Sequence, residues 1–146
     1  MIMLCFPVMG QIHKSVTIFS DLPGSVSLSA NYLGNDSIYI SFSGRDSKYT
    51  YINKIVTIFY GTSSEFYSWC NQLQKFSQEN EPDSKTDFNI DINGQRINLV
   101  KWMGKKALEI FEKNNPSAVC VVPSVYLLKI QKKFTDWADN NNIEYK

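Results

Sequence analysis

The stretch Ile55-Val56-Thr57-Ile58-Phe59-Tyr60-Gly61-Thr62-Ser63-Ser64-Glu65 joins an apolar run to the start of a helix. Its first six residues are mostly β-branched or aromatic, which favours a strand. Thr62 and Glu65 then match the capping box, in which the threonine accepts an amide of the first turn and the glutamate reaches back. Apolar residues recur at helical spacing from Phe66 to Phe76. The sequence therefore predicts a strand followed by a helix from about Ser63 to Asn80.

Upstream of this stretch, the pattern predicts an antiparallel meander. Apolar residues alternate with serine and asparagine over residues 25–32, which is the period of a strand with one buried face. A turn at residues 34–36 would pair Tyr32 with Ile38, and two further apolar pairs, Ala30 with Ile40 and Leu28 with Phe42, would fall on the same face. Further strands are expected at about residues 15–20 and 48–60. The first half therefore reads as four strands.

Downstream, the sequence predicts a hairpin, two helices and one more strand. Asn93-Gly94 between residues 88–92 and 95–99 is a strong hairpin signal. Apolar residues at helical spacing predict a second helix over about residues 100–113: Val100, Met103, Ala107, Ile110 and Phe111. Ala118–Val122 reads as a strand buried on both faces. Ser124 is placed to cap a last helix that ends near residue 140.

Together these elements predict an α+β fold, with one antiparallel sheet of about five to seven strands and three helices packed on it. The length of 146 residues suits a single domain over residues 1–146, in which residues 1–12 form an edge strand or a loose leader. Hydrophobic residues make up 43% and the net charge is +1. That balance gives no overall field to attract nucleic acid or a membrane.

Several chemistries find no support in the sequence. Three widely spaced cysteines, Cys5, Cys70 and Cys120, fit neither a disulfide framework nor a zinc site, and indicate reduced thiols in a cytoplasmic protein. The single histidine, His13, rules out a two-histidine mechanism within one subunit. We expect no cofactor, no catalytic centre and no membrane association.

Carboxylates offer one weak metal-site alternative. Asp83, Asp87 and Asp91 form a small acidic group in and beside the predicted hairpin. Their spacing lacks the loop glycine of a calcium site, and Asp91 has Arg96 as its expected cross-strand partner. An exposed ion pair is the simpler interpretation, so we expect no metal.

The two helix starts are candidate anion sites. Thr62, Ser63 and Ser64 offer hydroxyls and backbone amides where a phosphate could bind, and Ser124 offers a similar start. However, the pattern has one glycine and no lysine of a phosphate loop. Glu65 would also repel an anion there. Binding of a nucleotide or a nucleic acid at these starts is an alternative.

Trp102 is the most suggestive surface residue. On the predicted helix over residues 100–113 it would point away from the apolar stripe, among Lys105, Lys106 and Lys113. An outward tryptophan among lysines is typical of a protein interface, and could also stack on a nucleic-acid base. The opposite outcome is that Trp102 folds back against the sheet and is buried.

These observations predict a small non-enzymatic protein whose partner is another protein, such as an accessory, inhibitor, immunity or adaptor factor. Thirteen of the fifteen basic residues are lysine, and arginine is the residue that usually reads bases. The abundance of lysine and asparagine is typical of an AT-rich genome, such as that of a phage, a mobile element or a low-GC bacterium. Trp102, Lys105, Lys106 and Lys113 are the predicted interface.

Overall fold

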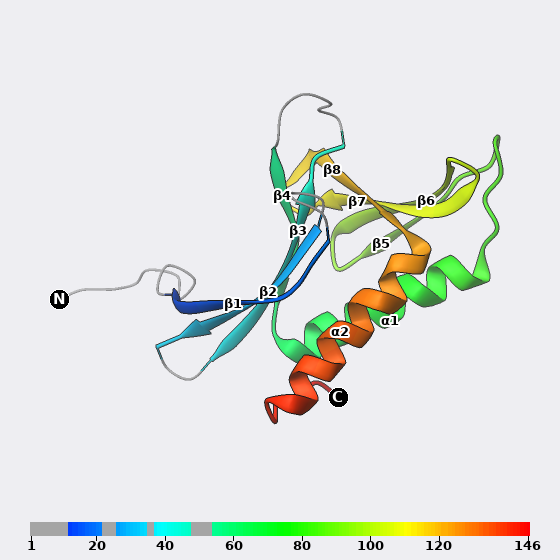
Figure 1. Ribbon diagram of the computed structural model, residues 1–146. Helices are drawn as coiled ribbons and strands as arrows, with labels where there is room; N and C mark the ends of the chain where they lie inside the picture. The colour runs from blue at the N-terminus through cyan, green and yellow to red at the C-terminus, as the bar shows by residue number, and fades with distance from the viewer. Residues whose placement is uncertain (1–11, 22–25, 35–36, 48–53) are drawn as a thin grey trace.

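The computed structural model describes residues 12–21, 26–34, 37–47 and 54–146. Within these residues the order of elements repeats, because four strands and a 17-residue helix are followed by four strands and another 17-residue helix (Figure 1). The first half contains β1 (Ile12–Asp21), β2 (Val26–Leu33), β3 (Ile38–Arg45), β4 (Ile55–Gly61) and α1 (Ser63–Glu79). The second half contains β5 (Phe88–Ile92), β6 (Gln95–Trp102), β7 (Lys105–Glu112), β8 (Asn115–Pro123) and α2 (Ser124–Asn140).

The α+β class is confirmed, but the details of the architecture differ from the prediction. The described strands form two four-stranded antiparallel sheets, β1-β2-β3-β4 and β5-β6-β7-β8, rather than one sheet of five to seven strands. The described part of the chain holds two helices, not three. The difference comes from residues 100–113, which form parts of two strands instead of a helix.

The first sheet has the predicted register. Tyr32 lies opposite Ile38, and the two other predicted pairs, Ala30 with Ile40 and Leu28 with Phe42, are also present. The apolar residues of these pairs face the core, because Leu28, Ala30 and Ile40 are fully buried. Predictions for residues 1–11 and for the early part of the 48–60 strand lie outside the described residues.

The second sheet confirms the Asn93-Gly94 hairpin and replaces the predicted second helix. Phe88 lies opposite Leu99, as expected. Beyond it the chain turns again at Met103-Gly104, where φ is +50° and +80°, close to the +52° and +83° of Asn93-Gly94. Two successive residues with positive φ make the tight turn that suits a two-residue hairpin. The turn reverses the chain where a helix would have continued.

Both remaining helices begin close to their predicted residues. The capping box of α1 is complete, since the Thr62 hydroxyl accepts the amide of Glu65 and the Glu65 carboxylate accepts the amide of Thr62. The predicted cap of α2 is wrong by one residue. Pro123 occupies the cap position and Ser124 is the first helical residue, whose hydroxyl accepts a hydrogen bond from Ser77 of α1 at 2.8 Å.

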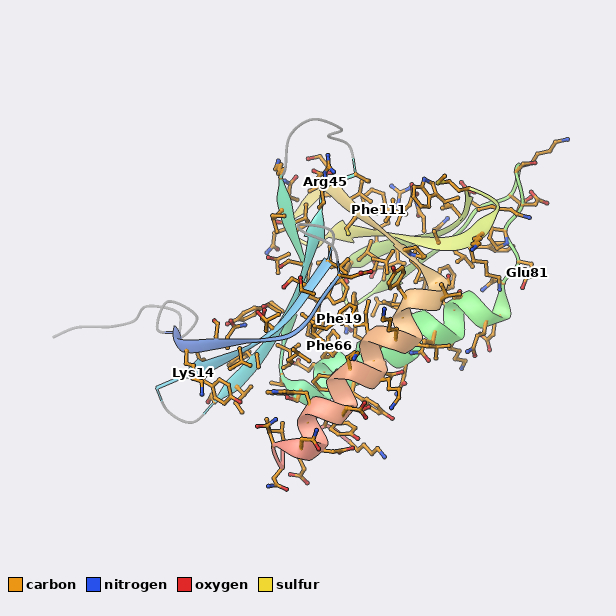
Figure 2. The ribbon with its side chains drawn as sticks, viewed as in Figure 1. Lys14, Phe19, Arg45, Phe66, Glu81 and Phe111 are labelled. Carbon is orange, nitrogen blue, oxygen red and sulfur yellow. The ribbon has the colours of Figure 1, made fainter. Side chains whose placement is uncertain are left out.

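One core joins the two halves. The helices α1 and α2 lie side by side and touch both sheets (Figure 1). Phe66 of α1 meets Phe134 of α2 edge-on, with ring centroids 4.9 Å apart. Strand β1 also contacts α2, since the Lys129 ammonium lies 5.4 Å from the centre of the Phe19 ring. Figure 2 marks Phe19 of β1 and Phe66 of α1. The buried cluster therefore contains residues from both sheets and both helices.

Candidate functional site

The hairpin between β6 and β7 places Trp102 at the end of a strand. Trp102 lies opposite Lys105, and Met103 and Gly104 form the turn between them. Trp102 is 49% exposed and Met103 is 81% exposed. The sequence pattern found Trp102 for a wrong reason, because its outward direction was derived from a helix that is absent. Met103 was wrongly predicted to lie on the apolar stripe of that helix, and the signal that could have placed it in an exposed turn was Gly104.

The predicted lysines do not form one cluster with Trp102. Lys106 is held by α1 and the connector after it, since its ammonium lies 2.6 Å from the carboxylate of Glu81 and donates to the carbonyl oxygen of Ser77 at 2.7 Å. Lys113 follows the far end of β7, roughly 26 Å of strand from Lys105. Only Lys105 remains beside Trp102. The candidate protein-binding surface is therefore the hairpin tip Trp102–Lys105.

Further exposed apolar side chains lie near the same end of the molecule. Ala107 near the start of β7 lies opposite Pro123, which ends β8 and leads directly into α2. The first turns of α2 expose Val125 and Leu128. The hairpin tip and the start of α2 thus belong to one end of the second sheet (Figure 1).

Several polar groups of the candidate anion sites at the two helix starts are bonded to other residues of the chain. At α1, Thr62 and Glu65 satisfy one another, Ser63 is buried, and Ser64 lies on the wall of a cleft. At α2, the Ser124 hydroxyl is bonded to Ser77. The structure does not bring the two starts together, because they belong to opposite ends of the antiparallel pair of helices (Figure 1).

A cleft of about 940 Å³ lies between β4, the first half of α1 and the turns that end β5 and β7. Sequence reasoning missed it, because its walls come from four segments distant in the chain. Its lining is mainly uncharged, with aromatic, hydroxyl and amide side chains. Tyr60, Gln72 and Asn93 represent these three kinds, and Glu65, Glu112 and Lys113 are its charged side chains.

Gln95 ties the two sheets together at the floor of this cleft. Its amide group donates to the carbonyl oxygens of Ile58 in β4 at 2.7 Å and of Phe111 in β7 at 2.9 Å. Its carbonyl oxygen accepts the indole N–H of Trp69 in α1 at 2.9 Å. Gln95 is 6% exposed, so its side-chain amide is satisfied by protein groups and not by bulk water. The same bonds satisfy the indole N–H of Trp69 and the carbonyl oxygens of Ile58 and Phe111.

Shifted pKa values among the described residues include those of two buried thiols and one exposed carboxylate. Burial raises the pKa of the Cys70 thiol, and burial together with the charge of Asp46 raises the pKa of Cys120 to about 12, so both stay protonated. Asp83 accepts the amides of Lys85 and Thr86, and these bonds lower its pKa. Among the described residues no group of three or more histidine, cysteine or acidic residues is arranged to hold a metal ion.

The comparisons with known proteins add no family. No protein-family model matches the chain, and no curated protein matches it. Within the described residues, neither helix is long and apolar enough to cross a membrane.

Proposed function

We propose that the chain is a small, non-enzymatic protein-binding factor that engages another protein through the hairpin tip Trp102–Lys105. The observation that carries the proposal is the pair of neighbouring large apolar side chains, Trp102 and Met103, exposed at a tight turn. Tryptophan is among the residues that contribute most to protein interfaces, and methionine adapts to irregular partner surfaces.

The backbone of Met103 adds weight to this proposal. Its φ of +50° lies in the left-handed region, which costs about 1–2 kcal/mol for residues with an ordinary side chain. The equivalent position in the other hairpin holds Asn93, a residue that adopts this conformation readily. Strained residues persist where the side chain has a use. An exposed methionine in this position fits a contact residue better than a turn residue.

Free thiols fit a cytoplasmic role for such a factor, and two surface features fit a protein partner. Cys70 and Cys120 are free, buried thiols, as is usual in a reducing compartment. Lys105 adds a positive charge beside Trp102, and Val125 and Leu128 are exposed in the first turns of α2. An accessory, inhibitor, immunity or adaptor protein encoded by a phage or a mobile element is the class that we infer.

The test is capture of partners from the native host with three forms of the tagged protein. Wild type and Lys113→Ala should capture the same protein, because Lys113 lies at the far end of the hairpin. Trp102→Ala should lose it while its thermal unfolding stays unchanged. Equal capture by all three forms would refute the role of the hairpin tip.

The alternative function, nucleotide or nucleic-acid binding at the helix starts, has weaker support. The groups that would hold a phosphate, at Thr62 and Ser124, are already bonded to Glu65 and Ser77. A thermal-shift series with nucleotides and sulfate tests it. A ligand at a hundred times its Kd should add about 2.7 kcal/mol to the free energy of unfolding.

A further inference from the structure

The outer face of the first sheet carries a regular array of uncharged polar side chains. The strand registers align these side chains in rows that cross the sheet. One row is Ser20, Ser27, Ser43 and Thr57, and the next is Thr17, Ser29, Ser41 and Tyr60. Charged residues make up 20% of the chain, so a solvent-facing sheet of this size would ordinarily hold some of them. These two rows hold none, and a charged residue beside them on this face is Arg45, which lies opposite Ile55.

A third row continues the array, and hydrogen bonds connect it to its neighbour. It consists of Ser15, Asn31 and Tyr39. The amide of Asn31 donates to the Ser41 hydroxyl at 3.1 Å, and its carbonyl oxygen accepts the Ser15 hydroxyl at 2.8 Å. We refer to the three rows together as the hydroxyl face. Its side chains offer both donors and acceptors without a net charge.

Two tyrosines stand at one border of the hydroxyl face. Tyr39 and Tyr60 are stacked, with ring centroids 5.4 Å apart and planes inclined by 7°. Tyr60 is 39% exposed. Burial and the neighbouring Tyr39 raise the pKa of Tyr60, so its phenol stays neutral. The border therefore presents an uncharged aromatic ring held in a fixed orientation.

The cleft continues from this border. Thr57 and Tyr60 belong to the hydroxyl face and also line the cleft of about 940 Å³. Across the cleft from them, amide side chains such as Asn93 and Asn114 come from the turns of the second sheet. The two surfaces thus adjoin at Thr57 and Tyr60, where the cleft adds apolar side chains such as Ile58 and Trp69 to the polar ones.

We propose that the hydroxyl face and the cleft bind a neutral carbohydrate chain, with Tyr60 as the ring on which a sugar packs. Sugar hydroxyls both donate and accept hydrogen bonds. Hydroxyl and amide side chains also do both, so they can pair with a sugar in either direction. The electron-rich face of an aromatic ring attracts the partly positive C–H groups of a sugar ring. The three rows hold no arginine or lysine for an anionic ligand, and in the cleft the positive charge of Lys113 is accompanied by the carboxylates of Glu65 and Glu112. An apolar ligand would leave the hydroxyls of the face unpaired.

This site is separate from the hairpin tip, so the two proposals can fail independently. The experiment measures depletion of the protein from solution by insoluble cellulose, chitin and cross-linked dextran. We expect at least one of them to bind the chain, and we expect binding to persist at about 1 M salt, where charges are screened beyond about 3 Å. Depletion by none of the three, or loss of binding at high salt, would overturn the proposal.

Variants at Tyr60 distinguish stacking from a general effect on the fold. Tyr60→Leu keeps an apolar side chain in the strand but removes the ring, and it should weaken binding at least about tenfold, which corresponds to about 1.4 kcal/mol. Tyr60→Phe keeps the ring and should bind like wild type. Trp102→Ala, on the other sheet, is the matched control and should also bind normally.

Two results with these variants would contradict the proposal. The first is undiminished binding by Tyr60→Leu, because it would show that the ring is not used. The second is a wild-type dimer that dissociates in Tyr60→Leu without any polysaccharide binding, because the face would then be covered by a second copy of the chain. Circular dichroism of each variant establishes that it is folded.

Discussion

At the scale of the residue, Gln95 illustrates how one side chain can determine the arrangement of two sheets. Its amide contacts β4, β7 and α1 at once. Glutamine is suited to this position, because it donates twice at one end and accepts at the other. The sequence offered no sign of this role, since Gln95 follows Asn93-Gly94 and reads as an ordinary strand residue. The bonding partners are between 16 and 37 residues away.

Replacing Gln95 tests this connection. Gln95→Leu leaves the Trp69 indole N–H and the carbonyl oxygens of Ile58 and Phe111 without their partner. A buried polar group without a partner costs about 1–3 kcal/mol, so we expect the free energy of unfolding to fall by about 3 kcal/mol or more in urea denaturation. The matched control is Gln72→Leu on the exposed side of α1, which should change stability by less than about 0.5 kcal/mol. Equal effects of the two variants would contradict the role of Gln95.

At the scale of the element, the sequence predicted those units whose signal is local. The β2–β3 register follows from residue alternation, and α1 follows from its capping box and apolar stripe. The segment 100–113 was predicted wrongly, because Ala107 and Ile110 share one stripe of a helix, whereas in β7 they point to opposite faces and both are buried. Gly104, whose φ is +80°, was the local sign of a turn. Periodicity alone does not distinguish two short strands from one helix.

The same hairpin separates stability from the proposed function. Met103→Asn places in the turn a residue that tolerates a φ of +50°, and should raise the free energy of unfolding by about 0.5–1 kcal/mol. Thermal and urea denaturation measure this gain. If the hairpin tip binds a partner, the same variant should capture less of it. Met103→Leu, which keeps the apolar bulk and the strain, should match wild type in both measurements. A less stable Met103→Asn would show that the turn is not strained.

At the scale of the whole molecule, the repeated order of elements does not produce two independent halves. Each helix packs against the other helix and against strands of both sheets. Gln95 links β6 to β4, and the Ser47 amide donates to the carbonyl oxygen of Val119 in β8 at 2.9 Å. Long-range contacts of this kind have no signature in a single sequence, which explains why one sheet was expected instead of two.

This shared core predicts cooperative unfolding. Phe134 lies in α2 of the second half, yet it is fully buried against Phe66 of the first. Phe134→Ala should therefore lower the free energy of unfolding by about 3–5 kcal/mol.

The whole molecule should still unfold in one transition, because neither sheet can bury its apolar face without the helices. Circular dichroism reports both halves, and in a Trp102→Phe background the fluorescence of Trp69 and Trp137 reports the helical layer, so the two urea curves should coincide. Exposed Leu128 provides the control, since Leu128→Ala should change stability by less than about 0.5 kcal/mol. Separate transitions for the two signals would mean that the halves fold as independent units and that their common core adds little.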